Sequence, residues 1–165
     1  MATLQKIIPN LWFDKQAEEA ATFYTSVFKN SKIGKKAYYG KEGFEIHGMP
    51  EGTVMTIAFE LDGQQFVGLN GGPYFKFSEA VSFIVNCGDQ EEIDHFWNKL
   101  KEGGDDKSQQ CGWLKDKFGL SWQIVPAALP GMIANGTTEQ SERVMKALLQ
   151  MKKLDVAALE KAYEG

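Results

Sequence analysis

The sequence has little of what several large classes of protein require. Its two cysteines, Cys87 and Cys111, lie far apart in a chain of 165 residues and form no Cys-x-x-Cys pair. Neither a disulfide framework nor a zinc site is indicated, and buried or half-buried thiols are the simplest interpretation. The 18 basic residues are outnumbered by 22 acidic ones and form no cluster. Because a phosphate backbone is bound by clustered positive charge, nucleic acid is not an expected partner.

Long apolar runs and nucleophile motifs are also missing. No run approaches the length of a membrane span, and the opening MATLQKIIPNLWF lacks the features of a secretory signal. We therefore expect a cytoplasmic protein with no membrane partner. No serine or cysteine stands in a recognisable nucleophile pattern, and no Gly-x-Gly-x-x-Gly opens a helix after a strand. The sequence therefore assigns no catalytic residue.

Two similar halves occupy most of the chain. In the first, the apolar KIIPNLWF precedes an amphipathic helix in AEEAATFYTSVF, a strand over 33–39 and a hairpin that turns at Asp62-Gly63. The order repeats in AVSFIVN, in QEEIDHFWNKL with its apolar residues at helical spacing, in a short strand over 111–114 and in SWQIVP. This repeat predicts an α+β fold of two βαβββ modules.

The end of the chain is predicted to be helical. Thr137 and Gln140 have capping-box spacing, an apolar stripe follows them, and Asp155 is placed to cap a last short helix. Such a stripe needs cover from the chain's own sheet or from a second subunit. We divide the chain into modules 1–72 and 73–126 and a helical extension 127–165, within one compact domain. The stripe and the open strand edges favour a homodimer.

Three segments resemble the vicinal oxygen chelate superfamily, which includes glyoxalase I, bleomycin-resistance proteins and extradiol dioxygenases. They are LWFDKQAEEAATFYTSVF, GGPYFKFSEAVSFIVNCGDQEEIDHFW and CGWLKDKFGLSWQIVP, and they are most similar to the PhnB-like group, whose members often carry the label 3-demethylubiquinone-9 3-methyltransferase. The tail QSERVMKALLQMKKLDVAALEKAYEG is similar to the C-terminal helices of that group. The resemblance implies that each module curls its sheet into a half-barrel, with a site between the halves.

Alternation along the strands predicts which side chains line that site. In the first, fifth and last strands, the bulky apolar residues Leu11, Phe13, Phe83, Val85, Leu120, Trp122 and Ile124 are expected to face the core. The residues expected to face inward are Ile8, Asn10, Trp12, Phe66, Gly68, Asn70, Ser82, Ile84, Asn86, Ser121, Gln123 and Val125.

The resemblance places the four metal-ligand positions of the superfamily at Ile8, Asn70, Ser82 and Gln123. This set contains no imidazole and no carboxylate, the donors that divalent ions of this class require. We therefore predict no bound metal and no cofactor. Gln123 is either an internally satisfied residue of an edge strand or an amide that faces a ligand. His47 and His95 are expected in a loop and on a helix surface.

These observations favour a metal-free protein that binds a small molecule. The predicted ligand-binding residues are Asn10, Trp12, Phe66, Asn70, Phe75, Ser82 and Gln123. Three alternatives stay open, and with them the question whether the protein is an enzyme. It could be a metal-dependent lyase, isomerase or dioxygenase with a rearranged site that recruits His47 or Glu60, a methyltransferase acting on a quinone-like substrate as the group's label suggests, or a purely structural protein.

Overall fold

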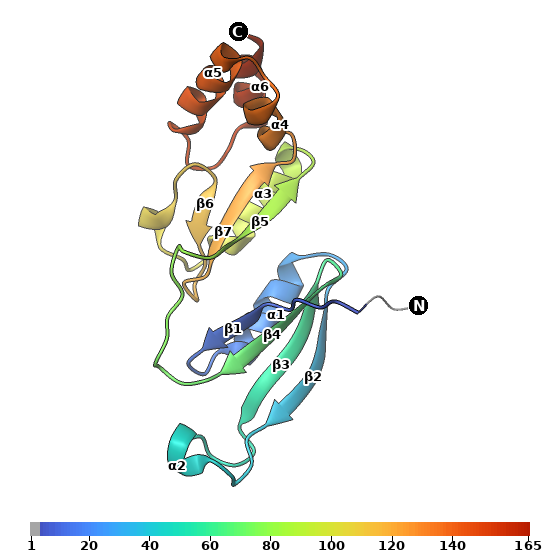
Figure 1. Cartoon of the computed structure of the whole chain (residues 1–165), viewed down its shortest axis with the longest axis vertical. Helices are drawn as coiled ribbons and strands as arrows, with labels where there is room; N and C mark the ends of the chain where they lie inside the picture. The colour runs from blue at the N-terminus through green and yellow to red at the C-terminus, as the bar shows by residue number, and fades with distance from the viewer. Residues whose placement is uncertain (1–3) are drawn as a thin grey trace. The chain divides into compact units, whose positions relative to one another are not determined.

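The computed structural model describes residues 4–165 and divides into two units, one ending at Lys76 and one from Phe77 to Gly165. The division falls close to the predicted boundary at residue 72. The C-terminal helices belong to the second unit (Figure 1). No helix among the described residues is long and apolar enough to cross a membrane.

The first unit is a βαβββ module built on one sheet, called sheet A, with the strand order β1-β4-β3-β2. Strand β1 is parallel to β4, and the other pairs are antiparallel. The elements are β1 (Asn10–Phe13), α1 (Ala17–Val27), β2 (Lys32–Tyr38), the short α2 (Phe44–His47), β3 (Val54–Leu61) and β4 (Gln64–Asn70). The predicted hairpin turn is confirmed, because Asp62 and Gly63 both have positive φ between β3 and β4.

Helix α1 packs on one face of sheet A. Its buried stripe includes Ala17, Ala20 and Tyr24, as the helical spacing predicted. The Tyr24 ring stacks on Phe59, with centroids 6.2 Å apart, and Phe59 stacks on Phe66 at 5.4 Å. These contacts make the α1 side of sheet A the core of the first unit, and the opposite side is called the open face of sheet A.

The second unit contains a three-stranded sheet, called sheet B, with the order β5-β7-β6. Strand β5 is parallel to β7, and β6 is antiparallel to β7. The elements are β5 (Ser82–Cys87), α3 (Gln90–Leu100), the 3-10 helix η1 (Asp106–Ser108), β6 (Trp113–Lys115), β7 (Ser121–Pro126), α4 (Leu129–Ala134), α5 (Thr138–Leu148) and α6 (Val156–Glu164). Ile93, Trp97 and Leu100 bury the predicted stripe of α3.

The α+β prediction is confirmed, but the second module is one strand shorter than predicted. Only β6 and β7 follow α3, and Gln110 forms an isolated bridge with Trp113. The backbone explains the difference. Cys111 and Gly112 both have positive φ, a conformation that turns the chain and cannot continue a strand, so β6 begins at Trp113 and not at Cys111.

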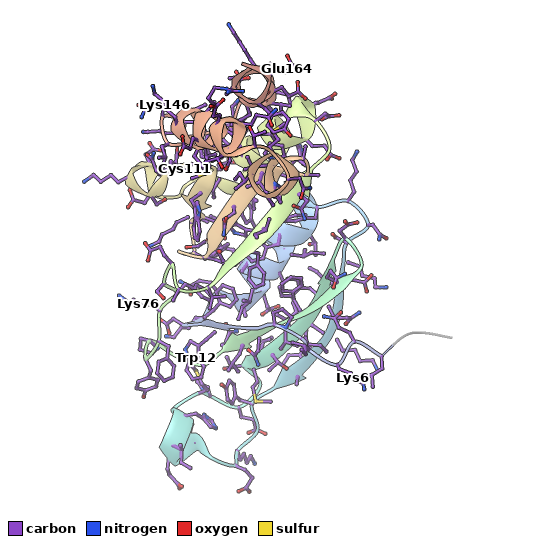
Figure 2. All side chains as sticks on the ribbon, turned by 45° about the horizontal axis from the view of Figure 1, so that its top comes forward. Lys6, Trp12, Lys76, Cys111, Lys146 and Glu164 are labelled. Carbon is purple, nitrogen blue, oxygen red and sulfur yellow. The ribbon has the colours of Figure 1, made fainter. Side chains whose placement is uncertain are left out.

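The C-terminal helices fold back on their own unit. Their apolar stripe is therefore covered by the chain's own sheet and not by a second subunit. One buried cluster joins β7 to these helices and consists of Val125, Leu129, Val144, Leu148, Leu154 and Leu159. Cys111, labelled in Figure 2, donates its backbone N–H to the Met151 carbonyl at 2.8 Å. The capping box of Thr137 and Gln140 and the cap at Asp155 are both present as predicted.

Candidate functional site

Sheet B has one buried face and one open face. On the buried face lie Val85, Leu114, Trp122 and Ile124, each at most 8% exposed. The other face, opposite to α3, carries the alternate residues and is called the open face because Ile84 there is 58% exposed, although Ser121 on the same face is buried. The predicted facing of β5 and of the first part of β7 is therefore confirmed.

Two polar side chains predicted to share a site are in contact on this open face. Gln123 Nε2 donates a hydrogen bond to Ser82 Oγ at 2.9 Å. The bond joins β7 to β5 and fixes the orientation of the amide, since its nitrogen must point to the hydroxyl. In the part of the chain that the structure describes, Gln123 Oε1 makes no hydrogen bond, so it is available as an acceptor. Ser82 can still donate its own hydroxyl proton.

The strand register assigns the neighbours of this pair. Ile84 and Trp113 flank Gln123 on the two adjacent strands, so the amide lies between an aliphatic and an aromatic side chain. Ser121 lies between Ser82 and Lys115 in the next row. The open face thus combines apolar surface with a few convergent polar groups, which is the composition of small-molecule sites.

Val125 was also predicted to face inward, and for this residue the prediction is wrong. It is 8% exposed and belongs to the buried cluster beneath the C-terminal helices. The helices cover this end of sheet B, so both sides of the strand are buried there and alternation no longer separates cavity from core.

On β4 the predicted facing is wrong for the whole strand. Phe66 stacks in the core of the first unit, and a Cβ built on Gly68 would lie 3.2 Å from Ala17 Cβ of α1. Asn70 is 5% exposed and accepts the Ala17 N–H through Oδ1 at 2.9 Å. The register explains this outcome, since Gly68 and Asn70 pair with Leu11 and Phe13, which were correctly predicted to face the core.

Asn70 therefore has a structural role in this unit. Its Oδ1 caps the first turn of α1, whose own N-cap residue Gln16 makes no capping bond, while Nδ2 donates to the Val54 carbonyl at 3.0 Å. One carboxamide thus satisfies a free N–H of a helix end and ties β4 to the start of β3. Both functional ends of the Asn70 side chain are occupied within the protein.

Two of the aromatic residues predicted to bind a ligand, Trp12 of β1 and Phe75, contact each other. Trp12 donates its indole N–H to the Gly72 carbonyl at 2.9 Å, and Phe75 meets the Trp12 ring edge-on with centroids 4.9 Å apart. A Cβ at Gly71 would lie 2.3 Å from the indole, so glycine is needed for this close approach. Asn10 and Ile8 are exposed, and Phe75 is 65% exposed.

The two residues suggested for a rearranged metal site, His47 and Glu60, are bonded to other groups of the protein. His47 Nδ1 accepts the Met49 N–H at 2.9 Å, and its Nε2 lies 3.2 Å from the Glu42 carbonyl. Glu60 pairs with Lys32 at 3.2 Å, and His95 is exposed on α3. Within residues 4–165, no three His, Cys, Asp or Glu side chains gather closely enough to hold a metal ion.

Cysteine chemistry is not favoured at Cys87. Cys87 is buried, and desolvation together with the charges of Glu92 and Asp89 raises its pKa to about 12. Because the thiolate is the reactive form, this thiol is inert at neutral pH. The prediction of buried or half-buried thiols is confirmed, since Cys87 is buried and Cys111 is half-buried.

Asp116 is an important residue that the sequence prediction missed. Its carboxylate is 2% exposed and accepts the backbone N–H groups of Phe118 and Leu120 and the Trp122 indole N–H, the last at 2.8 Å. It therefore shapes the turn that leads into β7 and fixes Trp122 on the buried face. The available signal was an aspartate before a Lys-Phe-Gly turn, a position at which carboxylates bond to the backbone.

Comparison with known proteins identifies the family. The family model described as 3-demethylubiquinone-9 3-methyltransferase matches residues 5–125. The structure of the PhnB protein from Bacillus cereus, which carries the same methyltransferase label, is 38% identical, with a TM-score of 0.64 over 74% of this chain and 100% of the other. The chain belongs to the 3-demethylubiquinone-9 3-methyltransferase family. The predicted PhnB-like resemblance is confirmed.

Other comparisons of this PhnB-like chain add the fold alone. A Pseudomonas aeruginosa protein of known structure is 21% identical, with a TM-score of 0.56 over 74% of this chain and 96% of the other. No curated protein matches the chain. The family match ends at residue 125, so the helical tail lies outside it and its predicted similarity to helices of the group is not supported by that match.

Proposed function

We propose that this PhnB-like protein binds a small organic molecule on the open face of sheet B without using a metal ion. The observation that carries the proposal is the Gln123–Ser82 pair, which sits among apolar neighbours with one acceptor and one donor still available. An amide and a hydroxyl orient a ligand by hydrogen bonds, while Ile84 and Trp113 offer apolar contact.

Metal-dependent chemistry is not favoured by the donors present. Of the four positions that the superfamily resemblance indicates for a metal, Ser82 and Gln123 are bonded to each other and Asn70 is committed to α1. Neutral oxygen donors alone do not offset the cost of dehydrating a divalent ion. The methyltransferase name is a family label, and no feature of the two units favours that reaction over binding.

A thermal-shift screen of small organic molecules tests the proposal. A compound that binds the native state should raise the melting temperature of the wild-type protein by mass action. The gain should vanish in Gln123→Leu, which removes the amide with little change in volume, and should persist in Gln150→Leu, which removes an exposed amide beyond α5. A compound that stabilises Gln123→Leu as strongly as the wild type would contradict binding at this face.

A further inference from the structure

One row of the open face of sheet B is unusual because it holds a buried polar atom without a partner. Ser121 is 1% exposed, and its Oγ makes no hydrogen bond within the described residues. A buried hydroxyl left unpaired costs free energy, so its presence in a native site calls for a physical explanation. The neighbours of Ser121 in the register are Ser82 on β5 and Lys115 on β6.

Lys115 supplies a positive charge to this row. Its Nζ pairs with Glu79 Oε1 at 2.5 Å, and the lysine side chain is 26% exposed while that of Glu79 is 65% exposed. The hydrogen bond from Lys115 lowers the pKa of Glu79, so the carboxylate is ionised at neutral pH. Glu79 lies three residues before β5 and Lys115 lies on β6, so the ion pair links the segment that leads into β5 to the strand on the other side of β7 in the sheet order.

We propose that the Ser82–Ser121–Lys115 row binds the oxyanion of a small molecule, a carboxylate or a phosphoryl group, and that Glu79 occupies the lysine until the ligand displaces it. This inference rests on the proposed binding face and names the class of its ligand. Ser121 then donates its unused proton to the anion, Ser82 donates a second, and Lys115 supplies the charge. The exposed Glu79 can swing into solvent at little cost, because exposed ion pairs are weak.

Two features make the site selective for an acid with an organic body. The next row, Ile84–Gln123–Trp113, lies beside the oxyanion row and carries the apolar contact and the free amide oxygen. A ligand that spans both rows therefore has a negatively charged end, an apolar middle and a hydrogen-bond donor for Gln123 Oε1. A neutral ligand would leave Ser121 unpaired and would not displace Glu79.

The test is isothermal titration calorimetry of the full chain with inorganic phosphate and with benzoate at constant ionic strength. Glu79→Gln removes the internal competitor and should bind at least one of the two anions severalfold more tightly than the wild type. Adding Ser121→Ala or Lys115→Met to Glu79→Gln should abolish the gain, and Lys115→Arg should retain part of it because a guanidinium also binds oxyanions. Circular dichroism confirms that each variant is folded.

Asp94→Asn is the matched control, since it frees Lys153 from an ion pair elsewhere in the same unit. If Glu79→Gln binds phosphate and benzoate no better than Asp94→Asn does, the inference is wrong. Its failure is separable from that of the proposed function. A neutral ligand that binds through Gln123 without responding to Lys115→Met would retain the binding face and overturn only the oxyanion row.

Discussion

Single side chains at the ends of strands hold each unit together. Asn70 is the main example in the first unit, because its carboxamide caps α1 and also bonds to the Val54 carbonyl. Asp116 has the same kind of role before β7. Both residues are buried and hydrogen-bonded within the protein. Ser121 is also buried, but its hydroxyl makes no hydrogen bond within the described residues.

We expect Asn70→Ala to lower the free energy of unfolding by about 1–3 kcal/mol, because it leaves the Ala17 N–H and the Val54 carbonyl without their partner. Asn86→Ala on β5 is the control, since Asn86 is exposed. Denaturant unfolding measures both. Equal stability of the two variants would show that the Asn70 bonds contribute nothing.

Trp122 and Gln123 are adjacent in sequence and should respond in opposite ways to substitution. Trp122 is 3% exposed and bonded to Asp116, so Trp122→Ala should cost roughly 3–5 kcal/mol through the void that it leaves beneath α3. Gln123→Leu lies on the open face and should be tolerated in folding. If denaturant unfolding shows Gln123→Leu to be the more destabilised variant, the two faces of β7 are assigned backwards.

At the scale of elements, the C-terminal helices are joined to α3 by a small polar network. Gln90 donates to the Leu154 carbonyl at 3.1 Å and accepts the Val156 N–H at 2.9 Å, and Lys153 pairs with Asp94 at 2.5 Å. The hydrogen bonds from Lys153 and Gln90 lower the pKa of Asp94 below its usual 3.8. The ion pair between Lys153 and Asp94 therefore depends on an ionised Asp94.

This dependence gives a pH prediction with a definite sign. A carboxyl whose pKa is lowered in the folded state adds stability above its unfolded pKa, and that stability is lost as the pH falls through the folded value. Wild type should be more stable than Asp94→Asn near neutral pH, by a small margin because the pair is exposed, and the difference should close in acid. Thermal unfolding of both proteins from neutral to acid pH measures this difference in stability. A difference that grows in acid would contradict a lowered pKa for Asp94.

The periodic elements were predictable from the sequence because alternation and helical spacing report burial directly. The spacing of Ala17, Ala20 and Tyr24 and the Asp62-Gly63 turn led to correct elements. The predicted orientation of the side chains was wrong on β4, because the small Gly68 and the polar Asn70 are typical of an open face. Alternation fixes two sets of residues but not which set is buried, and there a glycine beneath a helix and an asparagine that caps it form the buried set.

Within the site, the sequence could place Ser82 and Gln123 on one face because bulky residues flank both. It could not reveal the unpaired Ser121 or the Lys115–Glu79 bridge, since both depend on which strands are neighbours in sheet B. Strand order is set by tertiary packing and leaves no local signal in the chain. The role of Asp116 depended in the same way on a loop conformation.

At the scale of the whole molecule, the edge strands of the two sheets determine whether a second chain can pair with them. Edge strand β2 carries Lys32, Lys35 and Lys36 and shifts register against β3, features that discourage further pairing. Edge strand β5 has no charged residue from Ser82 to Cys87. We therefore still propose a homodimer, although the C-terminal stripe that also suggested one is covered within its own unit.

Light scattering tests this proposal on the full chain. We expect twice the mass of one chain at micromolar concentration, and Ile84→Lys, which places a charge on the exposed face of β5, should shift the protein towards monomer. Ile33→Lys on the charged edge strand β2 is the control and should leave the mass unchanged. A monomer in the wild type would rule the homodimer out.

The central claim is that sheet B binds an organic molecule without a metal, and native mass spectrometry of the protein purified from its own cells tests it most directly. We predict one small molecule bound to each chain of the wild type, retained after treatment with a chelator and lost in Gln123→Leu. A chain that carries a stoichiometric metal ion, or a bound molecule that leaves with the chelator or remains in Gln123→Leu, would contradict the account.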